Sequence, residues 1–115
     1  MGPKSSKARL CRKIEAPMAQ AQELTKILVG CCEQLAIGLE NLPSFQDLDK
    51  YWIEIHRLEN DGDRVSRDAV ASLFSNGIDP MVVIRWKDMF AVLEKAIDST
   101  ETAAHILEGI VIKNS

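Results

Sequence analysis

Three long segments, in which apolar residues recur every three or four positions, dominate this sequence. The first runs from about residue 17 to residue 40, the second from Ser44 to Ser75, and the third from Pro80 to near Lys113. This spacing gathers apolar side chains on one side of an α-helix, and alternating runs typical of β-strands are missing from the sequence. The sequence therefore predicts an all-α protein.

Helix start and stop signals occupy the two breaks between these segments. Ser44 and Asp47 have the spacing of a capping box, with Asp in place of Glu, and predict the start of the second helix. The Ser-Asn-Gly run at 75–77 predicts its end, and the Asp79–Pro80 pair predicts an N-cap followed by proline in the first turn. Pro17 is also expected in a first turn. Long helices joined by short turns must double back, which gives an up-down-up three-helix bundle.

Charge is distributed unevenly along the chain. The formal net charge is -3 at pH 7, which gives no broad attraction for nucleic acid or for an anionic membrane. Only basic charges occur up to Lys13, which predicts a basic, disordered tail over residues 1–15, ahead of a helical domain over residues 16–115. The basic residues of this segment are Lys4, Lys7, Arg9, Arg12 and Lys13.

Cysteine usage and hydropathy favour a cytoplasmic location. Cys11, Cys31 and Cys32 have neither the pattern of a disulfide framework nor that of a CxxC metal pair, which fits free thiols in a reducing compartment. No apolar run approaches the roughly 20 residues of a membrane span, and the start does not have the pattern of a secretory signal. Membrane insertion is therefore not expected.

Acidic residues recur with the same Glu-x-x-x-Asp spacing in the second and third segments. The first pair leans toward the apolar side of its helix, and the second set flanks the apolar stripe of its own helix. Like charges one turn apart repel each other, so these positions call for a cation. The residues are Glu59 and Asp63 in the second segment, and Glu94, Asp98 and Glu101 in the third.

The cation could come from the protein or from solution. Arg64 and Arg67 are near in sequence and could form ion pairs with the acids, whereas carboxylate oxygens also suit hard metal ions. On spacing alone both interpretations stay open. A ferritin-like di-iron site is not supported, because neither His56 nor His105 follows a Glu by three residues, and both are expected to be exposed. We find no Ser/His/Asp or Cys/His constellation, so an enzyme is not expected.

The segments LENDGDRVSRDAVASLF and DPMVVIRWKDMFAVLEKAIDSTETAAHILEGIVIKN resemble the PhoU-like phosphate-transport regulator family, in particular the branch encoded beside low-affinity (Pit-type) phosphate transporters. The resemblance runs from about Ala19 to Asn114 and covers only the second of that family's two three-helix repeats. It implies a cytoplasmic helical regulator that binds metal ions, with iron in first place and zinc or manganese as alternatives. The positions that match the family's metal motifs are Glu59, Asp63, Glu94, Asp98 and Glu101.

A single repeat would leave an apolar face without a partner, so we expect self-association into a homodimer of six helices. The expected function is that of a metal-binding, non-catalytic regulator or accessory protein of inorganic phosphate transport. It would contact a phosphate transporter or a phosphate-signalling protein, and through it the inner membrane. The alternative is a helical protein–protein interaction module without metal, whose acids form only a solvated, salt-bridged face.

Overall fold

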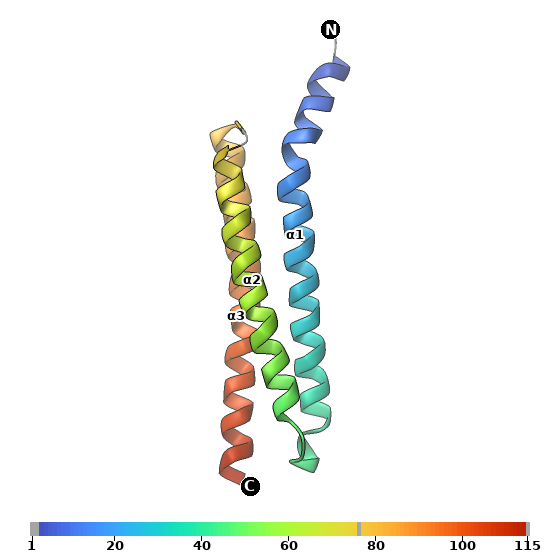
Figure 1. Cartoon of the computed structure of the whole chain (residues 1–115), viewed down its shortest axis with the longest axis vertical. Helices are drawn as coiled ribbons and strands as arrows, with labels where there is room; N and C mark the ends of the chain where they lie inside the picture. Colours follow the sequence, from blue (N-terminus) through green and yellow to red (C-terminus); the bar gives the residue numbers. More distant parts are fainter. Residues whose placement is uncertain (1–2, 76, 115) are drawn as a thin grey trace.

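The computed structural model describes the backbone of residues 3–75 and 77–114, and the side chains of residues 17–74 and 77–113. Within these residues the chain forms three long helices and a short 3₁₀ turn, with no β-strand: α1 (Pro3–Glu40), η1 (Leu42–Ser44), α2 (Asp49–Ser75) and α3 (Pro80–Asn114). Figure 1 shows that the chain reverses direction twice: α1 runs down the view, α2 runs up and α3 runs down again, which is the alternating order of an up-down-up bundle. The predicted all-α, three-helix architecture is confirmed.

The first helix begins earlier than the sequence predicted. α1 starts at Pro3 and contains Pro17 in its interior, so the expected start near residue 17 was wrong. Pro3 supplies a proline suited to a first turn, and the alanine, leucine, lysine and arginine residues that follow are good helix formers. The predicted boundary between a basic tail (residues 1–15) and the helical domain (residues 16–115) therefore does not coincide with a helix end. The side chains of this basic segment lie outside the described residues.

The connection between α1 and α2 differs from the predicted capping box. The Ser44 hydroxyl donates to the carbonyl oxygen of Asn41 at 2.8 Å and accepts from the backbone N–H of Gln46 at 3.3 Å. Phe45 and Asp47 have positive φ angles of 52° and 54°, which are not helical. Ser44 therefore closes η1, and the predicted helix start at this position was wrong.

The connection between α2 and α3 follows the sequence signals. α2 ends at Ser75, and Gly77 has a φ of +61°, the left-handed conformation that glycine adopts without a steric penalty. The Asp79 carboxylate accepts from the backbone N–H of Met81 at 2.8 Å and so caps α3, whose first residue is Pro80.

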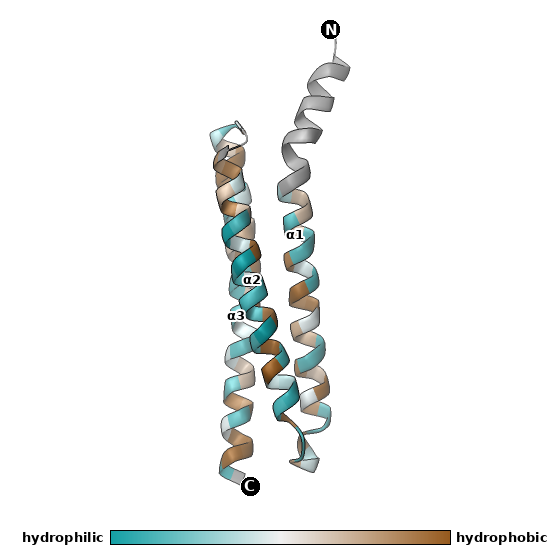
Figure 2. Ribbon diagram, viewed as in Figure 1, coloured by the Kyte–Doolittle hydropathy of each residue, from teal (hydrophilic) through white to brown (hydrophobic). Residues whose placement is uncertain are grey.

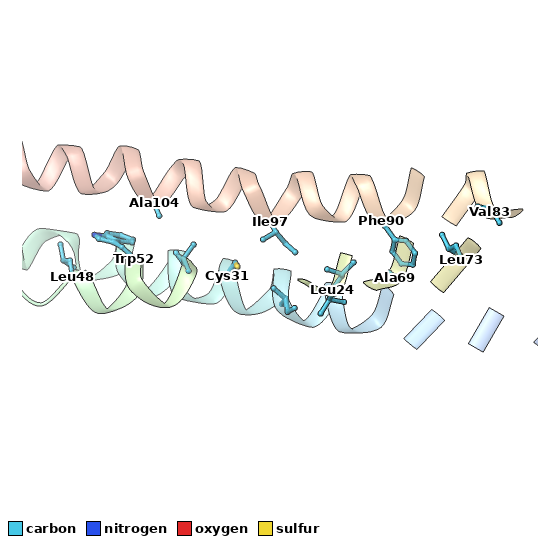
Figure 3. Packing of buried hydrophobic residues seen from close by; sticks show 13 residues of the cluster. Leu24, Cys31, Leu48, Trp52, Ala69, Leu73, Val83, Phe90, Ile97 and Ala104 are labelled. Carbon is cyan, nitrogen blue, oxygen red and sulfur yellow. The ribbon is translucent and has the colours of Figure 1, made fainter. Parts of the chain in front are cut away.

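One apolar core runs between the helices. Figure 3 shows Phe90, Ile97 and Ala104 of α3 pointing toward residues of the other two helices. The three- and four-residue spacing of apolar residues also places Leu39 of α1 and Met89 of α3 on the apolar stripes, but they are open to solvent, with exposed fractions of 46% and 50%. The buried apolar residues are Leu24, Ile27, Cys31, Leu48, Trp52, Ile55, Val65, Ala69, Leu73, Val83, Phe90, Ile97 and Ala104.

The helices differ in how their polar residues are distributed. Figure 2 shows long hydrophilic stretches on α2 and hydrophobic segments toward the C-terminus of α3. Within the described residues, none of the helices has an apolar stretch long enough to cross a membrane.

Gly38 allows α1 and α2 to approach closely near the α1–α2 connection. A Cβ added at this glycine would lie 2.8 Å from Cη2 and Cζ3 of Trp52, whose side chain is buried. We expect Gly38→Ala to lower the free energy of unfolding by about 1 kcal/mol or more, because overpacking of about 1–3 kcal/mol outweighs the gain in helix propensity. Urea denaturation followed by circular dichroism measures this change.

Gly109→Ala is the matched control for this substitution. Gly109 is also helical, but a Cβ there would meet nothing within 4 Å. We expect it to raise the free energy of unfolding by about 0.5–1 kcal/mol. Equal stabilisation by both substitutions would contradict the close packing of α1 against Trp52.

Candidate metal centre

Two side-chain contacts set the register between α2 and α3, which run in opposite directions (Figure 1). At one level, the Ser66 hydroxyl of α2 donates to Oε2 of Glu94 on α3 at 2.9 Å. Further along, Nδ1 of His56 on α2 lies 2.9 Å from Oε2 of Glu101 on α3. The acidic side chains between these two contacts therefore face one another across the α2–α3 boundary.

Four of the five predicted ligands meet there, and we call them the acidic cluster: Glu59 and Asp63 from α2, and Asp98 and Glu101 from α3. Glu59, Asp63 and Asp98 each offer an oxygen within 4.8 Å of the others. A second group of the same dimensions joins Glu59 to Glu101 and His56. Glu59 belongs to both groups, so they form one continuous site.

The electrostatics of the acidic cluster are unfavourable without a cation. The pKa of Glu59 is raised from 4.5 to about 7, first by burial of the carboxyl group and then by its hydrogen bond with Asp63. The negative charges of Glu101, Asp63 and Asp98 act in the same direction. A carboxyl group in such surroundings either holds a proton or requires a positive ion beside it.

Arginine does not neutralise the acidic cluster. Within the described residues, Arg64 and Arg67 take part in no ion pair within 4.0 Å. Arg57 pairs instead with Glu54 and with Asp61, at 3.1 Å for the second, on the more exposed side of α2. Ion pairing thus accounts for acids on that side of α2, and the acidic cluster has no such partner.

Glu94 was predicted as a ligand together with Asp98, but the structure does not bring it into either group. It lies one turn before Asp98 on α3, at the level of Ser66, whose buried hydroxyl donates to it. Because α2 presents a serine at that level, Glu94 already has a hydrogen-bond partner. Its assignment as a ligand stays a prediction.

His56 is the residue that sequence reasoning missed. It is 61% exposed, as expected, yet its ring lies against Glu101 and completes the second group of possible ligands. The signal was the His-x-x-Glu spacing to Glu59, which places both side chains on one side of α2. His105 lies farther away, with Nε2 3.8 Å from Oε1 of Glu101.

The donor set fits a hard or borderline metal ion. It consists of carboxylate oxygens and one imidazole nitrogen, the ligands that iron, manganese and zinc accept. Bonds of roughly 2.1 Å place ligand atoms on opposite sides of an ion about 4.2 Å apart, so the present spacing needs only small side-chain rotations. The free thiols of Cys31 and Cys32 lie outside both groups.

A groove of about 590 Å³ opens at the His56 end of the acidic cluster, between the first half of α2 and the last part of α3. Because Glu101 belongs to the acidic cluster and also lines the groove beside His56, ions can reach the cluster from solvent without separation of the helices. The groove is lined by residues that include Asp49, Trp52, Ile53, His56, Glu101 and His105.

Comparison with known proteins gives one informative match. The chain is similar to UPF0111 protein YkaA of Bacillus subtilis (strain 168). The two sequences are 31% identical over 87 residues, which cover 74% of this chain and 42% of YkaA. The chain therefore spans less than half the length of this relative. No family model matches the chain, and no solved structure matches it.

Proposed function

We propose that this protein is a PhoU-like, metal-binding regulator or accessory protein of inorganic phosphate transport, without catalytic activity. The resemblance of its α2 and α3 motifs to the PhoU-like family supports this proposal, and so does its similarity to a UPF0111 protein, since UPF0111 proteins are PhoU-like. We propose iron as the first candidate ion, with zinc and manganese as alternatives.

The observation that carries the proposal is an acidic cluster that no lysine or arginine of the described residues neutralises. Glu59 and Asp63 approach Asp98 and Glu101 from the opposite helix, and these acids have no lysine or arginine partner in the described part of the chain. A bound ion would supply the missing positive charge. The side chains would then hold α2 and α3 together at this level and orient the surface around the groove.

In this proposal the protein acts in the cytoplasm by contact with a phosphate transporter or a phosphate-signalling protein. Ion binding would link carboxylates of two helices that otherwise repel one another, so it can change the surface that a partner meets. The role of the side chains is therefore to bind and position, and no bond is made or broken.

Elemental analysis tests the ion site. The protein is purified without chelator, passed through a sizing column and analysed by plasma mass spectrometry, alone and after incubation with iron, manganese or zinc. We expect a reproducible ratio of metal to protein, and we expect Asp63→Asn to lower metal affinity about 10- to 100-fold, because the variant loses a charged ligand and keeps the side-chain volume.

Asp61→Asn is the matched control. It removes one negative charge from the same helix two residues away, but Asp61 pairs with Arg57 and lies outside the cluster. We expect its metal content to equal that of the unmodified protein. Metal-free protein after every incubation, or equal losses in both variants, would favour the alternative in which the acids form only a solvated face.

A further inference from the structure

α1 carries a second, uncharged stripe on the flank of the one that faces the core, and Leu28 and Leu35 of this stripe pack partly against the core. The residues of this stripe are spaced alternately three and four positions apart, from Met18 to Leu39, and none of them is charged. This is the heptad spacing of a helix that packs along another helix. Met18 and Leu39 are 43% and 46% exposed, and Cys32 on the same stripe is also exposed.

α3 has a stripe of the same kind. Its residues are again spaced alternately three and four positions apart, from Met89 to Ile110, and none of them is charged. Val92 and Ile106 on this stripe are 66% and 61% exposed. The core-facing stripe of α3 is separate and includes the buried Phe90.

Both stripes face away from α2, which places them on the one side of the bundle that α1 and α3 share. Gly30 of α1 lies against Leu58 of α2, and at 100° per residue Cys32 is on the opposite side of α1. In the same way Asp98 of α3 faces α2, and Ala96 lies on the opposite side of α3. We call the surface formed by the two stripes the α1–α3 face.

The size of the α1–α3 face suits a specific interface. Each stripe extends over about 30 Å of helix, and two adjacent helices are about 20 Å wide, which gives roughly 600 Å² for one copy. Two copies face to face would bury about 1,200 Å², the lower end of the range for specific protein interfaces.

Charge selects the relative direction of the two copies. The basic residues up to Lys13 all belong to the N-terminal end of α1, which Figure 1 places at the same end of the molecule as the α2–α3 turn. The other end, where α1 ends, α2 begins and α3 finishes (Figure 1), has an excess of acidic residues over its two lysines, Lys50 and Lys113. An antiparallel pair sets basic ends beside acidic ends, whereas a parallel pair sets like charges together. The acids at that end include Glu40, Asp47, Asp49 and Glu108.

We propose that a second copy of this chain docks on the α1–α3 face, antiparallel to the first and related to it by a two-fold axis. The same surface patch then serves both copies, as in isologous dimers. This assigns a surface and a direction to the self-association expected of a single repeat. It does not depend on metal binding, because the acidic cluster lies on the other side of α3.

Sedimentation velocity with matched variants tests the proposal. We expect the unmodified protein to be a dimer at about 100 µM, and Val92→Lys to weaken the dimer at least about tenfold, because the lysine charge would be buried in both copies. Ile53→Lys is the control. Ile53 is 68% exposed, like Val92, but lies on α2, so this variant should remain a dimer. Circular dichroism checks that both variants keep their helices.

The native thiol of Cys32 gives a second readout. In a Cys11→Ser background, alkylation of Cys32 should slow at least about tenfold as protein concentration rises through the dimerisation range, and Val92→Lys should abolish this protection. Higher salt should weaken the dimer, because opposite charges meet at the ends of an antiparallel pair.

A monomeric protein at the same concentration, Cys32 alkylation that is independent of concentration, or a dimer that Ile53→Lys disrupts and Val92→Lys does not, would overturn the proposal. A dimer that salt strengthens would overturn the antiparallel direction. Metal content is measured on the same samples. A metal-free dimer would thus support this inference and contradict the proposed function.

Discussion

Replacing Phe90 with alanine should destabilise the protein by about 3–5 kcal/mol, the largest effect that we expect from a single core substitution. Phe90 is fully buried and stacks on Trp86 with ring centroids 5.8 Å apart. Figure 3 shows its ring close to Ala69 and Leu73 of α2, so its removal leaves a cavity where α3 packs against α2. Urea denaturation followed by far-ultraviolet circular dichroism measures the loss.

Leu93→Ala is the comparison for Phe90→Ala on the same helix. Leu93 also packs against the core, but it is only partly buried. We therefore expect a loss smaller than that of Phe90→Ala, because fewer contacts are removed and solvent can fill part of the space. Equal losses, or a larger loss for Leu93→Ala, would contradict the packing described for α3.

The second large effect concerns how stability depends on pH. We expect the stability of the metal-free protein to fall as the pH rises, and bound metal to reverse this trend. In the metal-free folded protein Glu59 keeps its proton up to about pH 7, whereas the unfolded chain releases it near the ordinary pKa of 4.5. Between these values the folded state binds more protons, so raising the pH favours unfolding, by about 1 kcal/mol once solvent screening is allowed for. The thermal midpoint of metal-free protein should fall across this window.

A bound ion should change the sign of this dependence. Ligand carboxylates must be ionised to bind metal, so affinity rises with pH, and an ion at 100 times its Kd stabilises the folded state by about 2.7 kcal/mol. Above pH 7, added metal should therefore raise the thermal midpoint most. Scanning calorimetry with and without metal measures both curves.

Glu59→Gln tests whether both effects, the fall in stability with pH and the stabilisation by metal, depend on the carboxyl group of Glu59. The amide does not ionise, so the metal-free variant should lose most of the fall in stability between pH 4.5 and pH 7 and should gain little from metal. Asp61→Asn, outside the acidic cluster, should keep both behaviours. A metal-free protein whose stability rises through this window would show that Glu59 is not held among unpaired carboxylates.

Much of the fold could be predicted because the signals are local. The three-residue and four-residue spacing of apolar residues gives the helices, and Gly77 and Asp79 give the second turn with its correct cap. The first turn could not be placed in the same way. Ser44 can close a 3₁₀ turn as well as cap a helix, and the non-helical Phe45 and Asp47 decide between the two.

The candidate site was predicted in part for a related reason. Spacing along one helix places Glu59 with Asp63, and it also places Glu94 with Asp98. Which residues of the opposite helix they face depends on the register between α2 and α3. That register brings Glu101 and Asp98 to Glu59, and it leaves Glu94 beside Ser66.

The sequence by itself determined the helical class of this protein, the up-down-up order of its segments and the acidic character of two helix faces. These properties depend on residues a few positions apart, whose relative placement the geometry of an α-helix already sets. The tertiary structure alone decided that His56 lies against Glu101 of the acidic cluster, that arginine does not neutralise the cluster, and that Leu39 and Met89 lie open to solvent. The reason is that these properties depend on the packing of whole helices against one another, which residue spacing along a single helix does not specify.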